Sequence, residues 1–402
     1  MATKSSAVTV PESLIRPYMP ELDSIRGMAI LAVLLLHGFG MYRVASFAGL
    51  SRLFVALCSY GWCGVELFFV LSGFLITGIL LDTKTSTDYF RRFYTRRALR
   101  ILPAYYALLL FFFAISRTSW LGSHSVELPF IALSLVYLSN TAPLFGVAMQ
   151  YTVFWSLSVE EHFYLVWPMV VRRLDKRRLM QTALLVFLAV PMIRAISMRF
   201  GHVVDHNFYT WCNADGLAAG AILALTVRNP IFQRRALLRL AIAALTASVG
   251  ILVLGAKFKL LEWDSTIGFA TRLSFLNSAF TAILLLTILI GTSRQKWIVN
   301  LPVLRFLGEI SYGLYLYHML FFYAYEQLVV SYWPSLAPKN GAFKTIVLQF
   351  VAAGTLSVIM AFLSKRYFEN YFLNLKHRIF AKAEKQPYES VQWRKCSLKT
   401  TA

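Results

Sequence analysis

Long apolar stretches, separated by short polar loops, run along almost the whole chain. Eleven of them approach the roughly 20 residues that a helix needs to cross the hydrocarbon core of a bilayer. They cover residues 25–43, 60–81, 98–115, 128–146, 153–171, 179–196, 212–227, 237–255, 271–291, 306–330 and 343–364. Because helices satisfy their own backbone hydrogen bonds in lipid, this pattern predicts an all-α polytopic integral membrane protein.

Positive charge decides how many of these segments cross the membrane. The cation-rich loops are 82–97, 172–178, 228–236, 293–305 and the C-terminal tail. Loops of this kind stay in the cytoplasm. If all eleven segments crossed the membrane, the loop 172–178 and the cation-rich loops after it would lie on the opposite side. We therefore predict about ten transmembrane helices with both termini cytoplasmic. The segment 128–146, which contains Pro129 and Pro143, becomes an interfacial or re-entrant piece that is enclosed by protein or faces a wet cavity, and it is therefore a candidate to line the site.

The domain organisation follows from this count. We predict a cytoplasmic N-terminal tail over 1–20, a transmembrane domain over 21–375 and a basic, disordered cytoplasmic tail over 376–402 that is attracted to anionic lipid. The first apolar run has no cleavage site, so we expect it to remain in the mature protein.

Composition supports a membrane protein and argues against two other classes. With 58% hydrophobic residues and a mean hydropathy of +0.59, the chain is too apolar for a soluble domain. The net charge of +21 lies in loops and tail, so it indicates topology rather than nucleic-acid binding. The four cysteines lack metal-ligand spacing, and we expect no metal site.

Polar side chains inside predicted spans cost a few kcal/mol each and are therefore candidates for function. Asp23, Arg26 and His37 fall on the first span. Arg26 and His37 are eleven residues apart, which places them within about 20° of one helix face and about 16 Å apart along the axis. A structural interpretation makes Arg26 a topology anchor and His37 an interhelical hydrogen-bonding group. A functional one makes His37 a general base.

Arg97 and Arg100 share a helix face at the predicted cytoplasmic mouth of the third span. Arginine forks bind phosphate well, although anchoring at the membrane surface also explains part of this cluster. Arg100 lies one turn inside the apolar span, just before Pro103, and anchoring does not explain that position.

Three further segments add candidates. Glu160 and Glu161 begin a span near Trp155 and Tyr164, and one carboxylate can face the interior while its neighbour faces the loop or the lipid headgroups. His318 is a second intramembrane histidine, for which we favour a structural hydrogen bond. Asp215 lies on a face of small residues suited to close helix packing, and its role stays open.

Six sequence motifs, in this order, resemble the acyltransferase-3 family of membrane acyltransferases, which includes bacterial O-acetylases of lipopolysaccharide and other glycans. The motifs are LDSIRGMAILAVLLLH, VELFFVLSGFLIT, RRALRILP, WSLSVEEHFYLVWP, NADGLAAG and GEISYGLYLYH, within about Pro20 to Leu375. The chain departs from the family pattern at Glu66, where Asp is common, and after Glu369, where the usual proline is missing.

The resemblance implies a ten-helix fold that moves an acyl group, usually acetyl, from cytoplasmic acyl-CoA to an acceptor hydroxyl, often on a sugar. It implies catalytic roles for Arg26 and His37 and donor binding by Arg97 and Arg100. No fused extracytoplasmic hydrolase-like domain is visible, so we expect transfer to be completed in the membrane domain.

Our working hypothesis is an O-acyltransferase of the bacterial inner membrane. Its partners are acyl-CoA, membrane lipid and a glycan or other cell-envelope or secondary-metabolite acceptor, with no nucleic acid and no permanently bound cofactor. His37 acts as general base or carries the acyl group transiently, and Glu160 orients either the imidazole or a guanidinium. The alternative is a transporter or flippase of a glycan or small anion, although broken helices in matching halves are not found.

Overall fold

The computed structural model describes residues 14–380 except 17, 119, 199–206, 263–264, 294 and 340. Within these residues the secondary structure is helical and contains no strand, so the predicted all-α class is confirmed. The α-helices are α1 (Pro20–Leu35), α2 (Gly49–Cys58), α3 (Cys63–Asp82), α4 (Tyr89–Ile115), α5 (Leu128–Leu135), α6 (Val153–Arg173), α7 (Lys176–Ser197), α9 (Thr210–Val227), α10 (Arg234–Lys257), α11 (Thr266–Gly291), α12 (Pro302–Glu309), α13 (Ser311–Tyr332), α14 (Phe343–Leu363) and α15 (Asn370–Phe380).

Seven helical segments of the described chain are long and apolar enough to cross a membrane. They are Pro20–Gly40, Gly49–Asp82, Tyr89–Ile115, Lys176–Ser197, Arg234–Lys257, Thr266–Gly291 and Phe343–Lys376. Helices α6, α9 and α13 contain 21, 18 and 22 residues, which is also long enough, but they carry more polar side chains. The chain is therefore a multi-pass membrane protein, and the count of ten crossings stays a prediction.

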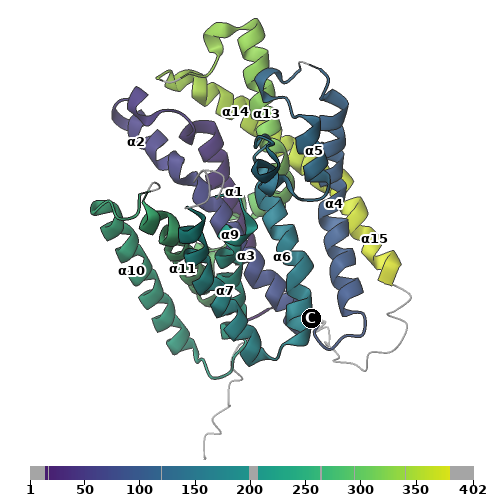
Figure 1. Ribbon diagram of the computed structural model, residues 1–402, viewed down its shortest axis with the longest axis vertical. Coiled ribbons are helices and arrows are strands. Elements are labelled where there is room, and N and C mark those ends of the chain that lie inside the picture. Colours follow the sequence, from purple (N-terminus) through teal and green to yellow (C-terminus); the bar gives the residue numbers. More distant parts are fainter. Residues whose placement is uncertain are drawn as a thin grey trace, which may run out of the picture.

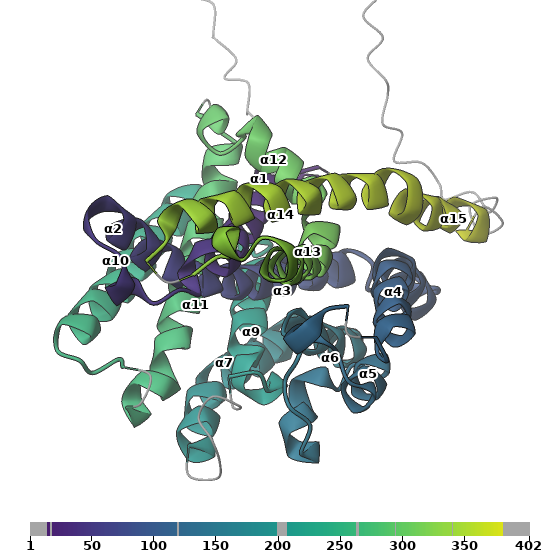
Figure 2. The same cartoon turned by 90° about the horizontal axis from the view of Figure 1, so that it is seen from above.

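The arrangement of the helices centres on α3, which contacts α1, α6, α9 and α11. Helices α7, α9, α10 and α11 gather on one side of the molecule, and α4, α5 and α6 lie on the other (Figure 1). Helix α14 continues through the π-helical turn Ser364–Glu369 into α15, and together they form one long rod that reaches α4 (Figure 2).

Helices α3 and α9 approach each other closely because glycine faces backbone at their crossing. A Cβ atom on Gly73 would lie 2.0 Å from the carbonyl oxygen of Leu217, and one on Gly220 would lie 2.0 Å from that of Val70. The small-residue face predicted around Asp215 is thus confirmed as a packing face.

The segment 128–146 was predicted not to form a membrane-spanning helix, and the structure confirms that its helix is interrupted. Helix α5 has eight residues and rises about 12 Å, and a 3₁₀ helix, Ser139–Phe145, follows it. Its polar groups are enclosed by protein, since Ser139 Oγ lies 2.8 Å from Ser158 Oγ and Asn140 donates to Thr210 Oγ1 at 2.9 Å. The expectation that this segment lines the site is wrong, because none of its residues borders either cavity described below.

The C-terminal boundary also differs from the prediction. Helix α15 continues to Phe380, whose ring lies 5.6 Å from the guanidinium carbon of Arg92 on α4. The first five residues of the predicted disordered tail are therefore helical, and residues 381–402 lie outside the described chain.

Candidate active site

Two neighbouring cavities contain most of the predicted site residues. The first has a volume of about 860 Å³ and is bordered by α1, α3, α4, α6 and α13. The second, of about 960 Å³, is bordered by the end of α1, α3, α6 and the start of α9. Val65 and Tyr315 line both cavities and form the wall between them.

The first cavity, called here the arginine cavity, gathers three cations and two carboxyl groups. Its charged lining residues are Arg26, Arg97, Arg100, Glu160 and Glu161. Arg97 and Arg100 meet there because their spacing places both on one face of α4, as predicted. The guanidinium carbon of Arg97 also lies 5.0 Å from the centre of the Tyr164 ring, a cation–π contact that orients it.

Arg26 enters the same cavity from α1. Its Nη1 donates to Asp23 Oδ1 at 2.6 Å, one helical turn earlier. Asp23 therefore holds the Arg26 side chain in place.

Glu160 is held by two hydroxyl groups. Ser72 Oγ donates to one carboxylate oxygen at 2.6 Å and the Tyr164 hydroxyl donates to the other at 2.9 Å. Glu160 thus lies beside the guanidinium groups, and among the described residues it makes no hydrogen bond to an imidazole or to a guanidinium, so its orienting role stays a prediction. Glu161 lines the arginine cavity as well, so the expected division of the two acids between interior and loop is wrong.

His37 lies in the second cavity, called here the histidine cavity. It belongs to the π-helical turn Leu36–Gly40 that follows α1, and such turns often occur at functional sites. Its Nδ1 lies 2.9 Å from the carbonyl oxygen of Val33 and 3.1 Å from His318 Nε2. The structure therefore places Arg26 and His37 in adjacent cavities, although their spacing predicts one helix face for both.

The rest of the histidine cavity mixes aromatic and polar groups. Trp155 packs between Phe69 and Phe208, with ring-centre distances of 5.8 and 5.5 Å. Glu66 is 3% exposed, and its Oε2 has no hydrogen-bond partner in the described part of the chain. Asn213 and Thr152 also line this cavity. Aromatic faces with a few polar groups suit a hydroxyl-bearing ligand.

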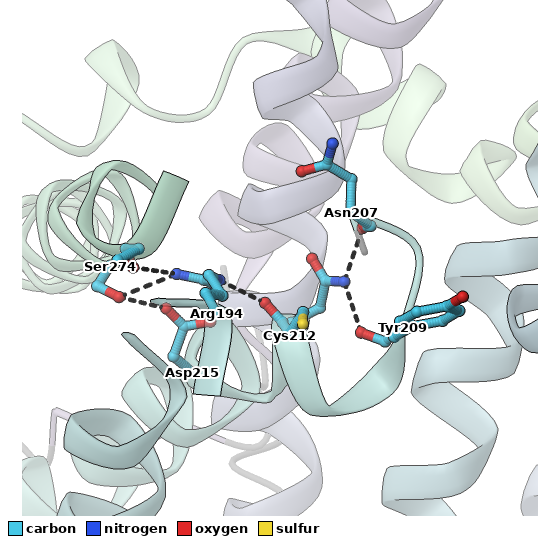
Figure 3. A network of polar contacts seen from close by, with 8 residues as sticks. Arg194, Asn207, Tyr209, Cys212, Asp215 and Ser274 are labelled. Atoms are coloured by element: carbon cyan, nitrogen blue, oxygen red, sulfur yellow. Dashed lines mark hydrogen bonds and ion pairs between the residues drawn. The ribbon is translucent and has the colours of Figure 1, made fainter. Parts of the chain in front are cut away.

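Asp215 belongs to neither cavity. Its carboxylate accepts from Arg194 Nη2 at 2.6 Å and from Ser274 Oγ at 2.7 Å, and both members of the ion pair are fully buried (Figure 3). Arg194 also donates to the carbonyl oxygens of Cys212 and Ala270. This network ties α7, α9 and α11 together, so the role left open for Asp215 is structural.

His318 lies on α13 and is fully buried, and it lines neither cavity. The favoured structural hydrogen bond exists, since His318 Nδ1 contacts the carbonyl oxygens of Leu314 and Tyr315. Its contact with His37 was not foreseen.

Sequence reasoning missed several residues of these cavities. Ser72 and Tyr315 are uncharged and were not selected, while Glu66 was noted only as a departure from the family pattern. The sequence does contain one indication that Glu66 and Arg194 matter, because each places a charge inside an apolar span.

Comparison with known proteins identifies the family to which the chain belongs. A family model described as an acyltransferase domain matches residues 19–366. The chain is similar to the peptidoglycan O-acetyltransferase OatA of Listeria monocytogenes, with 26% identity over 328 residues that cover 75% of this chain and 49% of that protein.

Two further relatives match more of the chain. The putative peptidoglycan O-acetyltransferase YrhL of Bacillus subtilis is 29% identical over 400 residues, which cover 91% of this chain and 56% of YrhL. The putative O-acetyltransferase SAS0844 of Staphylococcus aureus is 28% identical over 380 residues, which cover 88% of this chain and 57% of SAS0844. The chain thus spans about half the length of the curated relatives it matches. No solved structure matches it.

Proposed function

We propose, because the chain belongs to the acyltransferase-3 family of membrane acyltransferases, that it transfers an acyl group, acetyl in the simplest case, from acyl-CoA to an acceptor hydroxyl. The observation that carries this proposal is the juxtaposition of an arginine cavity and a histidine cavity across one wall, Val65 and Tyr315. The first suits a phosphorylated donor, and the second suits an alcohol that must lose a proton.

The donor binds in the arginine cavity. Guanidinium groups remain charged and bind phosphate oxygens through paired N–H donors, so Arg97 and Arg100 hold the phosphates of acyl-CoA. Arg26, fixed by Asp23, contributes a third positive charge. The loops that flank this end of the helices are rich in cations, which supports a cytoplasmic opening in the bacterial inner membrane with both termini on the same side.

The acyl group is transferred in the histidine cavity. The pantetheine arm passes the wall, so the Tyr315 side chain turns when the donor binds. His37 takes the proton of the acceptor hydroxyl as its oxygen attacks the thioester carbon. The carbon–sulfur bond then breaks, and the proton passes from His37 to the departing thiolate, giving the ester and CoA with a free thiol. If His37 carries the acyl group instead, the same nitrogen attacks first.

The acceptor occupies the space between Trp155, Glu66 and Asn213. Sugars offer both apolar faces for stacking and hydroxyl groups for hydrogen bonds, and this lining provides partners for both. The relatives named as acting on peptidoglycan support a glycan of the cell envelope as the acceptor class.

Acyl-CoA turnover by purified protein in detergent tests this function against a transporter or flippase. Radiolabelled acetyl-CoA should lose its label to water or to an added glycan at a rate that depends on His37. A transporter has no need for CoA, so the absence of CoA release by well-folded protein, with and without glycan, would contradict the proposal.

A further inference from the structure

The hydrogen bonds of His318 determine which of its ring nitrogens carries a proton. Its Nδ1 lies 3.1 Å from the carbonyl oxygen of Leu314 and 2.8 Å from that of Tyr315. Carbonyl oxygens only accept, so Nδ1 must be the donor. In a neutral ring, Nε2 then carries the lone pair and can only accept.

This assignment fixes the tautomer of His37 in turn. His37 Nδ1 lies 3.1 Å from His318 Nε2 and 2.9 Å from the carbonyl oxygen of Val33, and both of these partners are acceptors. His37 Nδ1 must therefore carry a proton. The Val33 carbonyl already accepts from the backbone N–H of Leu36, whereas Nε2 of His318 has no other partner among the described residues.

We propose that His318 is a positioning residue that holds His37 in the tautomer protonated at Nδ1, so that Nε2 is the basic nitrogen offered to the substrate. The proposal rests on the proposed function of His37. It gives a directed chain of hydrogen bonds from His37 Nδ1–H to His318 Nε2, and from His318 Nδ1–H to the α13 backbone. His37 Nε2 makes no hydrogen bond within the described chain, and His37 lines the cavity where the acceptor binds.

The same chain assists the reaction. When His37 Nε2 takes the hydroxyl proton, the ring becomes an imidazolium and its Nδ1–H becomes a stronger donor. His318 Nε2 accepts that bond without moving, because its ring is held by two carbonyl groups and is fully buried. His318 keeps its own proton throughout, and the proton that His37 gained leaves with the thiolate.

A purely structural role predicts something different. If His318 only ties α13 to α1, any side chain that preserves folding should preserve turnover. We compare His318→Gln, whose amide oxygen can still accept from His37 Nδ1–H, with His318→Met, which cannot accept strongly. His162→Gln is the matched control, because His162 also makes an interhelical contact, to Thr210 Oγ1 at 2.6 Å, but lines neither cavity.

Nitrogen-15 NMR of histidine-labelled protein in detergent reads the tautomers directly, with the His37 signals assigned by their loss in His37→Gln. We expect His37 to be protonated at Nδ1 in the wild type and in His318→Gln, and to populate both tautomers in His318→Met. A wild-type His37 protonated at Nε2 would overturn the proposal, and this measurement needs no activity and no variant of His318.

Turnover provides the second measurement. In His318→Met we expect kcat to fall about 10- to 100-fold, the value of one hydrogen bond to a charged group, with the KM for acetyl-CoA unchanged. His318→Gln should recover most of this loss, and His162→Gln should leave kcat unchanged. Full kcat in folded His318→Met overturns the positioning role even when His37→Gln is inactive. Full activity of His37→Gln would instead contradict the proposed function and leave the hydrogen-bond assignment standing.

Discussion

The hydroxyl groups of Ser156 on α6 and Tyr315 on α13 are hydrogen-bonded to each other in the wall between the arginine and histidine cavities. This contact holds the Tyr315 ring between the cavity lined by the arginines and the cavity lined by His37. Since Tyr315 lines both cavities, its position determines whether the two are joined.

Loosening this wall should uncouple donor consumption from acyl transfer. In Tyr315→Phe the ring loses its bond to Ser156, so the wall closes less tightly around the pantetheine arm and water reaches the thioester more readily. We expect a severalfold rise in the ratio of CoA released to acetyl transferred. Tyr317→Phe is the control, because the Tyr317 hydroxyl bonds to Ser364 and lines neither cavity. An unchanged ratio would show that Tyr315 does not control this passage.

The arginine cavity should govern the affinity for the donor. Replacing Arg97 and Arg100 together with Gln removes two charged phosphate contacts, each worth about 1.5–3 kcal/mol, and should raise the KM for acetyl-CoA at least tenfold. Arg91→Gln is the control, because Arg91 is exposed on the same helix and lies outside the cavity. The same KM for acetyl-CoA in both variants would show that Arg97 and Arg100 only anchor the helix at the membrane surface.

The buried ion pair of Arg194 and Asp215 should matter for stability rather than chemistry. Asp215→Leu leaves an unpaired buried guanidinium and should cost about 3–5 kcal/mol of folding free energy. The double variant Arg194→Leu with Asp215→Leu removes both charges and should recover much of that loss. Thermal unfolding in detergent checks this, and a double variant less stable than the single one would contradict it.

Sequence patterns could predict most of the fold and the members of the arginine cavity. Hydropathy located the long helices, and the i, i+3 spacing of Arg97 and Arg100 placed both on one helix face. Local sequence patterns could not predict which side chains from distant segments contact each other in the folded protein. The contact between His37 and His318, the wall formed by Tyr315 and the ion pair of Asp215 with Arg194 all join residues far apart in sequence. Uncharged residues such as Tyr315 also carry no signal of function on their own.

The predicted orientation can be tested at the ends of α7. A reporter fused after Arg178 should be cytoplasmic, because five cations in 172–178 resist export, and a reporter fused at His202 should be extracytoplasmic. Residues 199–206 lie outside the described structure, so this test is independent of the geometry above. Opposite locations would overturn the ten-crossing topology.

The role of His37 is the central claim, and the turnover of folded His37→Gln protein tests it most directly. Glutamine keeps a hydrogen-bonding amide near Val33 and His318 but cannot take a proton. If His37 is the base or the acyl carrier, acetyl transfer should fall at least about 100-fold, while acetyl-CoA still binds in the arginine cavity. If His37 only links helices, stability should drop by about 1 kcal/mol and transfer should stay close to that of the wild type. Near-normal transfer by His37→Gln would contradict the mechanism.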